Sequence, residues 1–330
     1  MPRLHDHLQS FYSDHVEPTA DQKSQADDSQ AHLRELVEAK HESDALFPRL
    51  IEGEFLAGSF ARNTKPKPLD DVDLYLVLDG VGLTAYDRGM FLGSVVRGSN
   101  ASWNPILDNH YNGPDGMKSS IVVLNAFRDA LRESYPKSDI RRDGQAVNVW
   151  LDSYGLGIDV VPAFHIIPAG SGERYFIPAG NGLHGWLATN PKVDTEAMDL
   201  HDAIHGGQLR PIIKLVKHWS KNVGRTGLKS YHLEVMVREA MTQNTTGASI
   251  ERLQTAFQLV SPRVLAACPD PAGFGDPLDK YLDPAQRNAI ASRFTEASIA
   301  VATARILETR ESIAAAVGAL QTVFGDRLGN

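Results

Sequence analysis

The 330-residue sequence has little of several features that mark particular classes of protein. Its single cysteine, Cys268, excludes an intramolecular disulfide and the cysteine-rich zinc sites. No apolar run approaches the roughly 18 residues that a membrane span needs. Residues 1–15 lack the apolar core of a signal peptide. We therefore expect a cytoplasmic protein with no membrane partner.

An excess of positive charge is also absent, because 33 Lys and Arg stand against 41 Asp and Glu, a net charge of −8. Proteins that bind long nucleic acids usually carry a basic stripe, so we do not expect a polymeric RNA or DNA partner. A few local lysines remain available for a small anion. Hydrophobic residues make up 42% of the chain and charged residues 22%, which is typical of a globular protein with a sizeable core.

The pattern of apolar residues changes along the chain. The first half predicts helices and strands together: a helix over 24–42, a short strand at EFLAG, a strand at DVDLYLVL, a short helix near 86–96, a helix over 119–135, and a hairpin of QAVNVWLD with GIDVVPAF. A Gly- and Pro-rich connector follows residue 168. Beyond it the periodicity is helical, over 195–204, 208–222, 230–242, 249–260, 284–308 and 309–323. We expect two domains, 1–180 with the N-terminal helix and 181–330 as a helical lobe.

Three aspartates lie in or beside segments that read as buried strands, although carboxylates next to a core need a partner. Asp71 and Asp73 are two apart, so their side chains leave the same face of a strand, roughly 6.5–7 Å apart along it. Asp159 is a third acid inside an apolar strand, and the three converge if the two strands are neighbours. Hard oxygen ligands of this kind suit one or two Mg²⁺ or Mn²⁺ ions.

A lone D-x-D pair is more often a solvated or salt-bridged strand end than a metal site. The preceding Gly58-Ser59 favours chemistry here. Glycine permits a close approach of the backbone, and a serine hydroxyl with the following N–H groups is able to hold phosphate oxygens.

The order Gly58-Ser59, then Asp71-Val72-Asp73, then Asp159 resembles the DNA polymerase β-like nucleotidyltransferase superfamily, whose signature is hG[GS] followed about a dozen residues later by Dh[DE]h. The resemblance implies an α+β fold: a polymerase β-like core of mixed sheet with flanking helices, a C-terminal helical lobe, and an active site in the cleft between them. It implies that Asp71, Asp73 and Asp159 bind two Mg²⁺ ions for attack of a ribose hydroxyl on the α-phosphate. Asp70 lies outside the pattern.

The segment "LRPIIKLVKHWSKNVGRTGLKSYHLEVMV" narrows the family. By spacing alone its lysines form a solvated helix face, and Ser230 is a helix N-cap. The K-x-x-K-x-W and K-S-Y-x-L-E order, however, resembles the helical lobe of cyclic GMP-AMP synthase-like and DncV-like enzymes, the CD-NTases. That resemblance implies that Lys217 and Ser230 contact the donor phosphates and that Tyr231 stacks on its base, with Lys214 and Lys229 as further candidates.

We therefore expect a template-independent enzyme that makes a cyclic di- or trinucleotide second messenger from nucleoside triphosphates, with loss of pyrophosphate. The family resemblance implies antiphage signalling and a separate effector protein that reads the product. Two alternatives remain at this point. One is a nucleotidyltransferase that acts on a tRNA end or another acceptor. The other is a catalytically silent nucleotide-binding sensor of the same fold.

Overall fold

The computed structural model describes residues 3–51, 55–80, 83–87, 94–98, 111–113, 116–166, 174–180, 182, 184–241, 247 and 249–329. The chain forms two compact units. The helical unit comprises Met1–Thr19, Arg62–Leu69 and Asp194–Asn330, and the sheet unit comprises Ala20–Ala61 and Asp70–Val193. The helical unit therefore includes two segments from the first half of the sequence, in contrast to the continuous ranges 1–180 and 181–330 that the sequence predicts.

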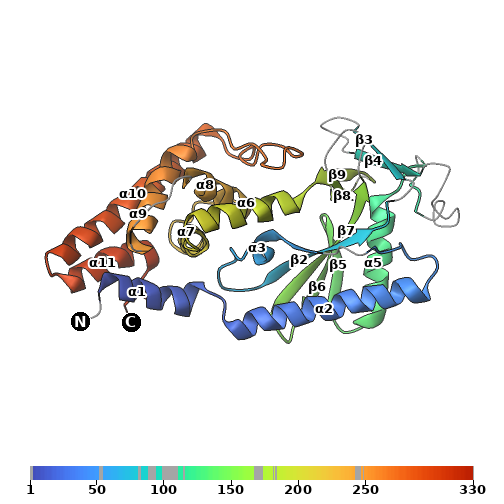
Figure 1. Cartoon of the computed structure of the whole chain (residues 1–330), viewed down its shortest axis with the longest axis horizontal. Helices are drawn as coiled ribbons and strands as arrows, with labels where there is room; N and C mark the ends of the chain where they lie inside the picture. Colours follow the sequence, from blue (N-terminus) through green and yellow to red (C-terminus); the bar gives the residue numbers. More distant parts are fainter. Residues whose placement is uncertain are drawn as a thin grey trace. The chain divides into compact units, whose positions relative to one another are not determined.

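The mixed α+β composition predicted from the sequence is confirmed (Figure 1). The described helices are α1 (Leu4–Phe11), a π-helical turn (Tyr12–Val16), α2 (Ala20–Ser43), α3 (Gly58–Ala61), α5 (Ser120–Ser134), α6 (Pro191–Ile204), α7 (Leu209–Asn222), α8 (Ser230–Ala240), α9 (Ser249–Arg263), α10 (Pro284–Thr309) and α11 (Ile313–Phe324). The described strands are β1 (Phe55–Ala57), β2 (Asp71–Leu78), β3 (Leu83–Asp87), β4 (Ser94–Gly98), β5 (Asp139–Asp143), β6 (Ala146–Leu151), β7 (Leu156–Ile166), β8 (Arg174–Pro178) and β9 (Trp186–Thr189).

The described strands of the sheet unit form one mixed sheet in the order β1-β2-β7-β8-β9-β4-β3, with β6 also beside β7 and β5 beside β6. The long strand β7 is the centre of this arrangement. It runs parallel to β2 and antiparallel to both β6 and β8. Parallel neighbours need a long crossover between them, and here the chain between β2 and β7 supplies it with the helix α5.

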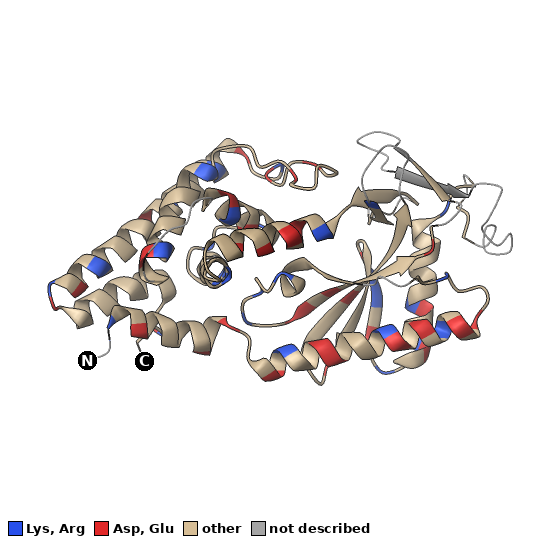
Figure 2. Cartoon of the chain, viewed as in Figure 1, with Lys and Arg blue, Asp and Glu red and all other residues tan. Residues whose placement is uncertain are grey.

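The helices α2 and α5 pack against each other and against the sheet. Helix α5 begins at the N-cap Ser119, whose hydroxyl accepts the Val122 N–H at 3.2 Å. On β2, the alternate residues Val72 and Leu74 are fully buried. The acids of β2 therefore leave from the opposite face, because side chains alternate along a strand. Figure 2 shows charges of both signs along α2, as expected of a helix with one face in solvent.

The core of the helical unit is built around α7. Its predicted apolar stripe is confirmed, because Ile212, Val216 and Trp219 are all buried. The Trp219 ring packs edge-on against Phe257 of α9 at 4.8 Å and against Phe294 of α10 at 4.7 Å. Aromatic pairs prefer such tilted geometry, which adds to the gain from burial. These contacts fix α7 and hence its polar face.

The short helix expected near residues 86–96 falls mainly on residues 88–93, which lie outside the described part; the described residues beside them lie in β3 and β4. The expectation of an irregular connector after residue 168 is wrong. The Gly- and Pro-rich connector contains the strands β8 and β9.

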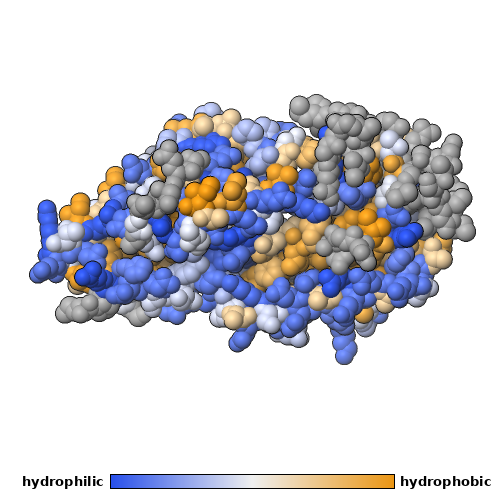
Figure 3. Space-filling model, in the orientation of Figure 1, coloured by the Kyte–Doolittle hydropathy of each residue, from blue (hydrophilic) through white to orange (hydrophobic). Residues whose placement is uncertain are grey.

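In the described part of the chain, none of the helices has the length and apolarity to cross a membrane. Hydrophilic residues predominate on the face seen in Figure 3, with apolar groups in patches.

Candidate active site

The candidate site of the sheet unit is the acid-bearing face of β2. Asp71 is exposed and Asp73 is half-buried, while Val72 between them is buried on the other face. Strand β1 pairs antiparallel with β2 and places Ala57 opposite Asp73. The turn that follows β1 therefore begins beside the Asp73 side chain.

Asp159 of β7 is the register partner of Asp73 across the parallel pair β2–β7. Register partners in a sheet project from the same face on strands about 4.8 Å apart, so the Asp73 and Asp159 side chains leave the same face of neighbouring strands. Asn148 of β6 donates a 2.8 Å hydrogen bond from Nδ2 to Oδ1 of Asp159. Burial raises the pKa of Asp159, an effect that the Asn148 hydrogen bond opposes and the nearby charge of Asp143 reinforces.

The Gly58-Ser59 turn lies directly against these acids. Gly58 has a φ of +66°, a conformation that L side chains rarely adopt. A Cβ atom placed at Gly58 would lie 1.7 Å from Oδ2 of Asp73. Only glycine therefore allows the backbone of this turn and the Asp73 carboxylate to occupy their positions together. Ser59 follows as the second residue of α3.

The donor set on this face is chemically suited to a hard divalent cation. Within the described residues, no group of three or more His, Cys, Asp and Glu side chains is gathered closely enough to hold a metal ion. Mg²⁺ is usually held by one or two carboxylates together with substrate phosphates rather than by a cage of protein ligands alone. The paired acids on one face and the space that Gly58 leaves at Asp73 fit that mode of binding.

Substitution of Gly58 with alanine is expected to lower any activity of this site at least tenfold, because the new methyl group displaces the Asp73 carboxylate. The measurement is the rate of nucleotide turnover together with the unfolding temperature. Gly144→Ala is the matched control, since Gly144 also has a positive φ of +55° but no atom within 4 Å of the added Cβ. Equal activity of the two variants would contradict a role for the Gly58–Asp73 contact.

The helical unit has a candidate site of its own, a cavity of about 510 Å³. Five basic side chains line it and no acidic residue does: Lys65, Lys67, Lys217, Lys221 and Arg225. Ser230, at the first position of α8, lines the same cavity. Basic side chains, a hydroxyl and the N–H groups of a helix start together form an anion-binding surface.

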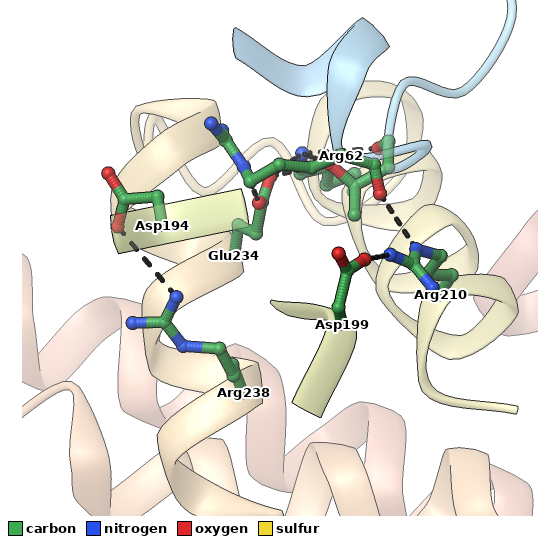
Figure 4. A network of polar contacts seen from close by, with 8 residues as sticks. Arg62, Asp194, Asp199, Arg210, Glu234 and Arg238 are labelled. Carbon is green, nitrogen blue, oxygen red and sulfur yellow. Dashed lines mark hydrogen bonds and ion pairs between the residues drawn. The ribbon is translucent and has the colours of Figure 1, made fainter. Parts of the chain in front are cut away.

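Lys217 lies at the floor of this cavity in a buried ion-pair network. Its Nζ lies 2.5 Å from Oε2 of Glu234 and donates to the backbone oxygen of Thr64 at 3.1 Å. Arg62 donates from Nε to Oε1 of the same carboxylate at 2.5 Å (Figure 4). Burial alone would raise the pKa of Glu234, but the charges of Lys217 and Arg62 and their hydrogen bonds lower it to about 2. The network thus places two cations on one carboxylate.

Further ion pairs of the helical unit surround this network (Figure 4). Arg210 donates from Nε to the backbone oxygen of Arg62 at 2.8 Å and pairs with Asp199 and Asp202. Arg238 lies 3.8 Å from Asp194. The segment Arg62–Leu69 is in this way fixed to the helices.

The remaining predicted residues are placed as follows. Tyr231 lies under the Arg62 guanidinium, 5.2 Å from ring centroid to Cζ, and lines a second cavity of the helical unit. Lys214 is buried, with Nζ 2.7 Å from Glu17 and 2.9 Å from the side-chain oxygen of Asn63. Lys229 precedes α8 as its N-cap residue. The structure therefore gathers Gly58, Asp73 and Asp159 in one unit, and it gathers Lys217 and Ser230 at one cavity in the other.

Sequence reasoning missed Asn148, Lys65, Lys67 and the role of Arg62 as a partner of Glu234. The alternation in QAVNVWLD did place a polar residue between two buried valines, which is the one signal for Asn148. Lys65 and Lys67 stand in the short run TKPKP between Gly58-Ser59 and Asp71, but only the fold shows that this run belongs to the helical unit.

Comparison with known proteins agrees with this fold. No family model matches the chain. It is 31% identical over 196 residues to a probable cyclic nucleotide synthase of Bacillus cereus, a match that covers 58% of this chain and 57% of the relative. The chain thus spans somewhat more than half the length of that curated relative.

Two groups of solved structures superpose over nearly the whole chain. CdnC of E. coli MS115-1, in complex with HORMA-deltaN, has a TM-score of 0.70 at 17% identity and covers 99% of this chain and 98% of its own. The apo form of Vibrio cholerae DncV has a TM-score of 0.67 at 13% identity and covers 99% and 96%. Another DncV structure contains the linear intermediate 5′ pppA(3′,5′)pG, with a TM-score of 0.64 at 11% identity, 99% and 97% covered. The chain has the fold of CdnC and DncV, and the resemblance to the CD-NTases drawn from its motifs is confirmed.

Proposed function

We propose that this chain is a template-independent nucleotidyltransferase that joins nucleoside triphosphates into a cyclic di- or trinucleotide and releases pyrophosphate. The observation that carries the proposal is the placement of Asp73 opposite Asp159, with Gly58 against the Asp73 carboxylate. The same fold in DncV, which is named a cyclic AMP-GMP synthase, supports it. The similarity to the Bacillus cereus synthase supports it further.

The proposed reaction asks the protein mainly to position groups and to stabilise charge. Asp71, Asp73 and Asp159 are the residues that would hold two Mg²⁺ or Mn²⁺ ions. Such ions, when bound, supply positive charge to the phosphates and make a ribose hydroxyl more acidic. Asn148 orients Asp159 through its 2.8 Å hydrogen bond. Gly58 lets the backbone of the turn approach, and Ser59 offers a hydroxyl to a phosphate oxygen.

In the helical unit, the cavity lined by Lys217 and Ser230 is the proposed seat of the β- and γ-phosphates. Charge-assisted hydrogen bonds from lysine to phosphate are stronger than neutral ones, and no acidic residue among those lining the cavity opposes an anion. Tyr231, adjacent to Ser230 in sequence, is the proposed stacking partner of the base. ATP in complex with CdnC supports a nucleoside triphosphate as the substrate.

The product would act as a second messenger in antiphage defence, read by a separate effector protein in the cytoplasm. This part of the proposal rests on the resemblance to the CD-NTases. CdnC has been solved in complex with HORMA-deltaN, which supports a protein partner for this chain as well.

The test is incubation of the purified chain with all four ribonucleoside triphosphates and Mg²⁺ or Mn²⁺, followed by phosphatase treatment and mass spectrometry. We expect a phosphatase-resistant species with the mass of a cyclic di- or trinucleotide. A parallel reaction with tRNA as acceptor tests the alternative activity, which is transfer of a nucleotide to a tRNA end. Label transfer to tRNA without a cyclic species would replace the proposal, and nucleotide binding without any turnover would favour a silent sensor.

A further inference from the structure

The loop between α9 and α10, residues 264–283, is rich in Gly, Pro and Asp but has a defined conformation. Leu278 donates its N–H to the Cys268 oxygen at 2.7 Å, and Cys268 donates its own to Oδ1 of Asp279 at 2.9 Å. Asp279 in turn pairs with Arg287 of α10. Asp270 accepts two further backbone N–H groups within the loop, at 3.0 and 2.8 Å. Long ordered loops of this kind often carry binding residues.

Tyr281, near the end of this loop, is anchored to the start of α8. Its hydroxyl accepts the Lys229 N–H at 2.8 Å and lies 3.1 Å from Nδ1 of His232. Burial lowers the pKa of His232 to about 4, so the imidazole is neutral at pH 7 and shares a hydrogen bond with the tyrosine hydroxyl. The Lys229 ammonium lies over the ring at 4.8 Å from its centroid. The Tyr281 ring is therefore held in one position from both its edge and its face.

Tyr281 and Tyr231 line one cavity of about 350 Å³ in the helical unit. Pro277 and Leu278 of the loop add apolar wall, and His232 of α8 closes it beside them. This volume is at the small end of the range for ligand pockets, about 300–1,000 Å³. Its aromatic and aliphatic lining suits a flat, apolar group with polar edges.

The position of this cavity identifies its occupant. Residues Lys229, Ser230 and Tyr231 are consecutive in the first turn of α8, where Ser230 lines the basic cavity and its two neighbours line the aromatic one. An anion in the first cavity and an aromatic ring in the second are the two ends of one nucleotide. Inorganic phosphate has no group for the second cavity.

We propose that Tyr281 and its loop form the second wall of a nucleobase pocket, opposite or beside Tyr231, for the nucleoside triphosphate whose phosphates bind at Lys217 and Ser230. This inference rests on the proposed function for the identity of the phosphate site. It assigns the 264–283 loop a substrate-recognition role in addition to closing the helical unit. Asp276 and Lys280, a 2.9 Å ion pair at the rim of the cavity, then lie where the base edge would be read.

The experiment compares the binding of ATP and of inorganic tripolyphosphate, which lacks the base and sugar, by calorimetry. Tyr281→Ala is expected to weaken ATP about 5- to 150-fold, the loss of about 1–3 kcal/mol of base stacking, and to leave tripolyphosphate within twofold. Tyr281→Phe keeps the ring and is expected to bind ATP within a few-fold of the parent. Tyr154→Ala, at an exposed tyrosine of the sheet unit, is the matched control.

Equal losses for ATP and tripolyphosphate in Tyr281→Ala would mean that Tyr281 only supports α8, and unchanged ATP affinity would mean that it touches no base. Either result overturns the inference. Product formation by the parent chain distinguishes a failure of this inference from a failure of the proposed function. If ATP binding depends on Tyr281 but no cyclic product forms, the synthase proposal alone fails. If product forms and Tyr281→Ala binds ATP as the parent does, the base-pocket inference alone fails.

Discussion

The Asp71→Asn/Asp73→Asn double variant is expected to make no phosphatase-resistant product, a loss of at least about 1,000-fold in rate. Two carboxylates are removed from the face that also holds Asp159. Several kcal/mol of transition-state charge stabilisation depend on cations that carboxylates of this kind hold. Asparagine keeps the size of each side chain, and Asp71 is exposed while Asp73 is half-buried. We therefore expect the unfolding temperature to change by no more than a few degrees.

Asp70→Asn is the matched control for this variant. Asp70 adjoins the pair but precedes β2, and its backbone oxygen accepts the Gly157 N–H at 2.9 Å, a contact that the substitution keeps. Most of the activity should remain in that variant. Undiminished synthesis by the double variant would show that the chemistry lies elsewhere in the chain.

The sequence predicted those elements whose signal is local. The run of apolar, β-branched and aromatic residues that ends at Asp79-Gly80 predicts strand β2, and an apolar stripe predicts α7. The strands β8 and β9 were missed because their stability comes from pairing with each other and with β7, and not from their own glycine-rich surroundings. The described residues 83–87 and 94–98 pair as β3 and β4, which their own sequence does not indicate. Sheet pairing depends on distant partners, which one sequence does not reveal.

The candidate site residues also divide into those that a local sequence pattern predicts and those that it does not. The spacing of Asp71 and Asp73 places both side chains on one face of a strand, and Asp159 is recognised as an acid inside an apolar strand. No local pattern predicts the surroundings of Lys217. Its carboxylate partner Glu234 also binds Arg62, which lies 172 positions before Glu234 in the sequence. Nor does any pattern in the sequence indicate that Gly58 makes room for the Asp73 carboxylate. Motifs thus predict candidate residues, while the contacts that orient them are seen only in the fold.

Glu234→Ala is the substitution with the largest expected effect on stability, about 3–5 kcal/mol, because it leaves the Arg62 and Lys217 cations buried without their shared carboxylate. The exposed fraction of the Glu234 side chain is 1%, so water has no access to replace it. Denaturant unfolding followed by circular dichroism measures the change. The lowered pKa of Glu234 also has a consequence for acid stability. Its contribution should be present above pH 4.5 and be lost as the pH falls from 4.5 toward about 2.

Glu239→Ala on the same helix is the matched control, since Glu239 pairs with Arg263 at 2.6 Å but its side chain is 37% exposed. Exposed pairs contribute about 0–1 kcal/mol, so the two glutamates should differ by at least about 2 kcal/mol. Loss of Glu234 also removes the ion-pair partner of the Lys217 amine, which lines the proposed phosphate cavity. The affinity of the variant for tripolyphosphate therefore measures the effect on this cavity separately from the effect on folding. A Glu234→Ala chain as stable as the Glu239→Ala chain would contradict the buried network, because two unpaired cations at 5% exposure or less cannot be tolerated without cost.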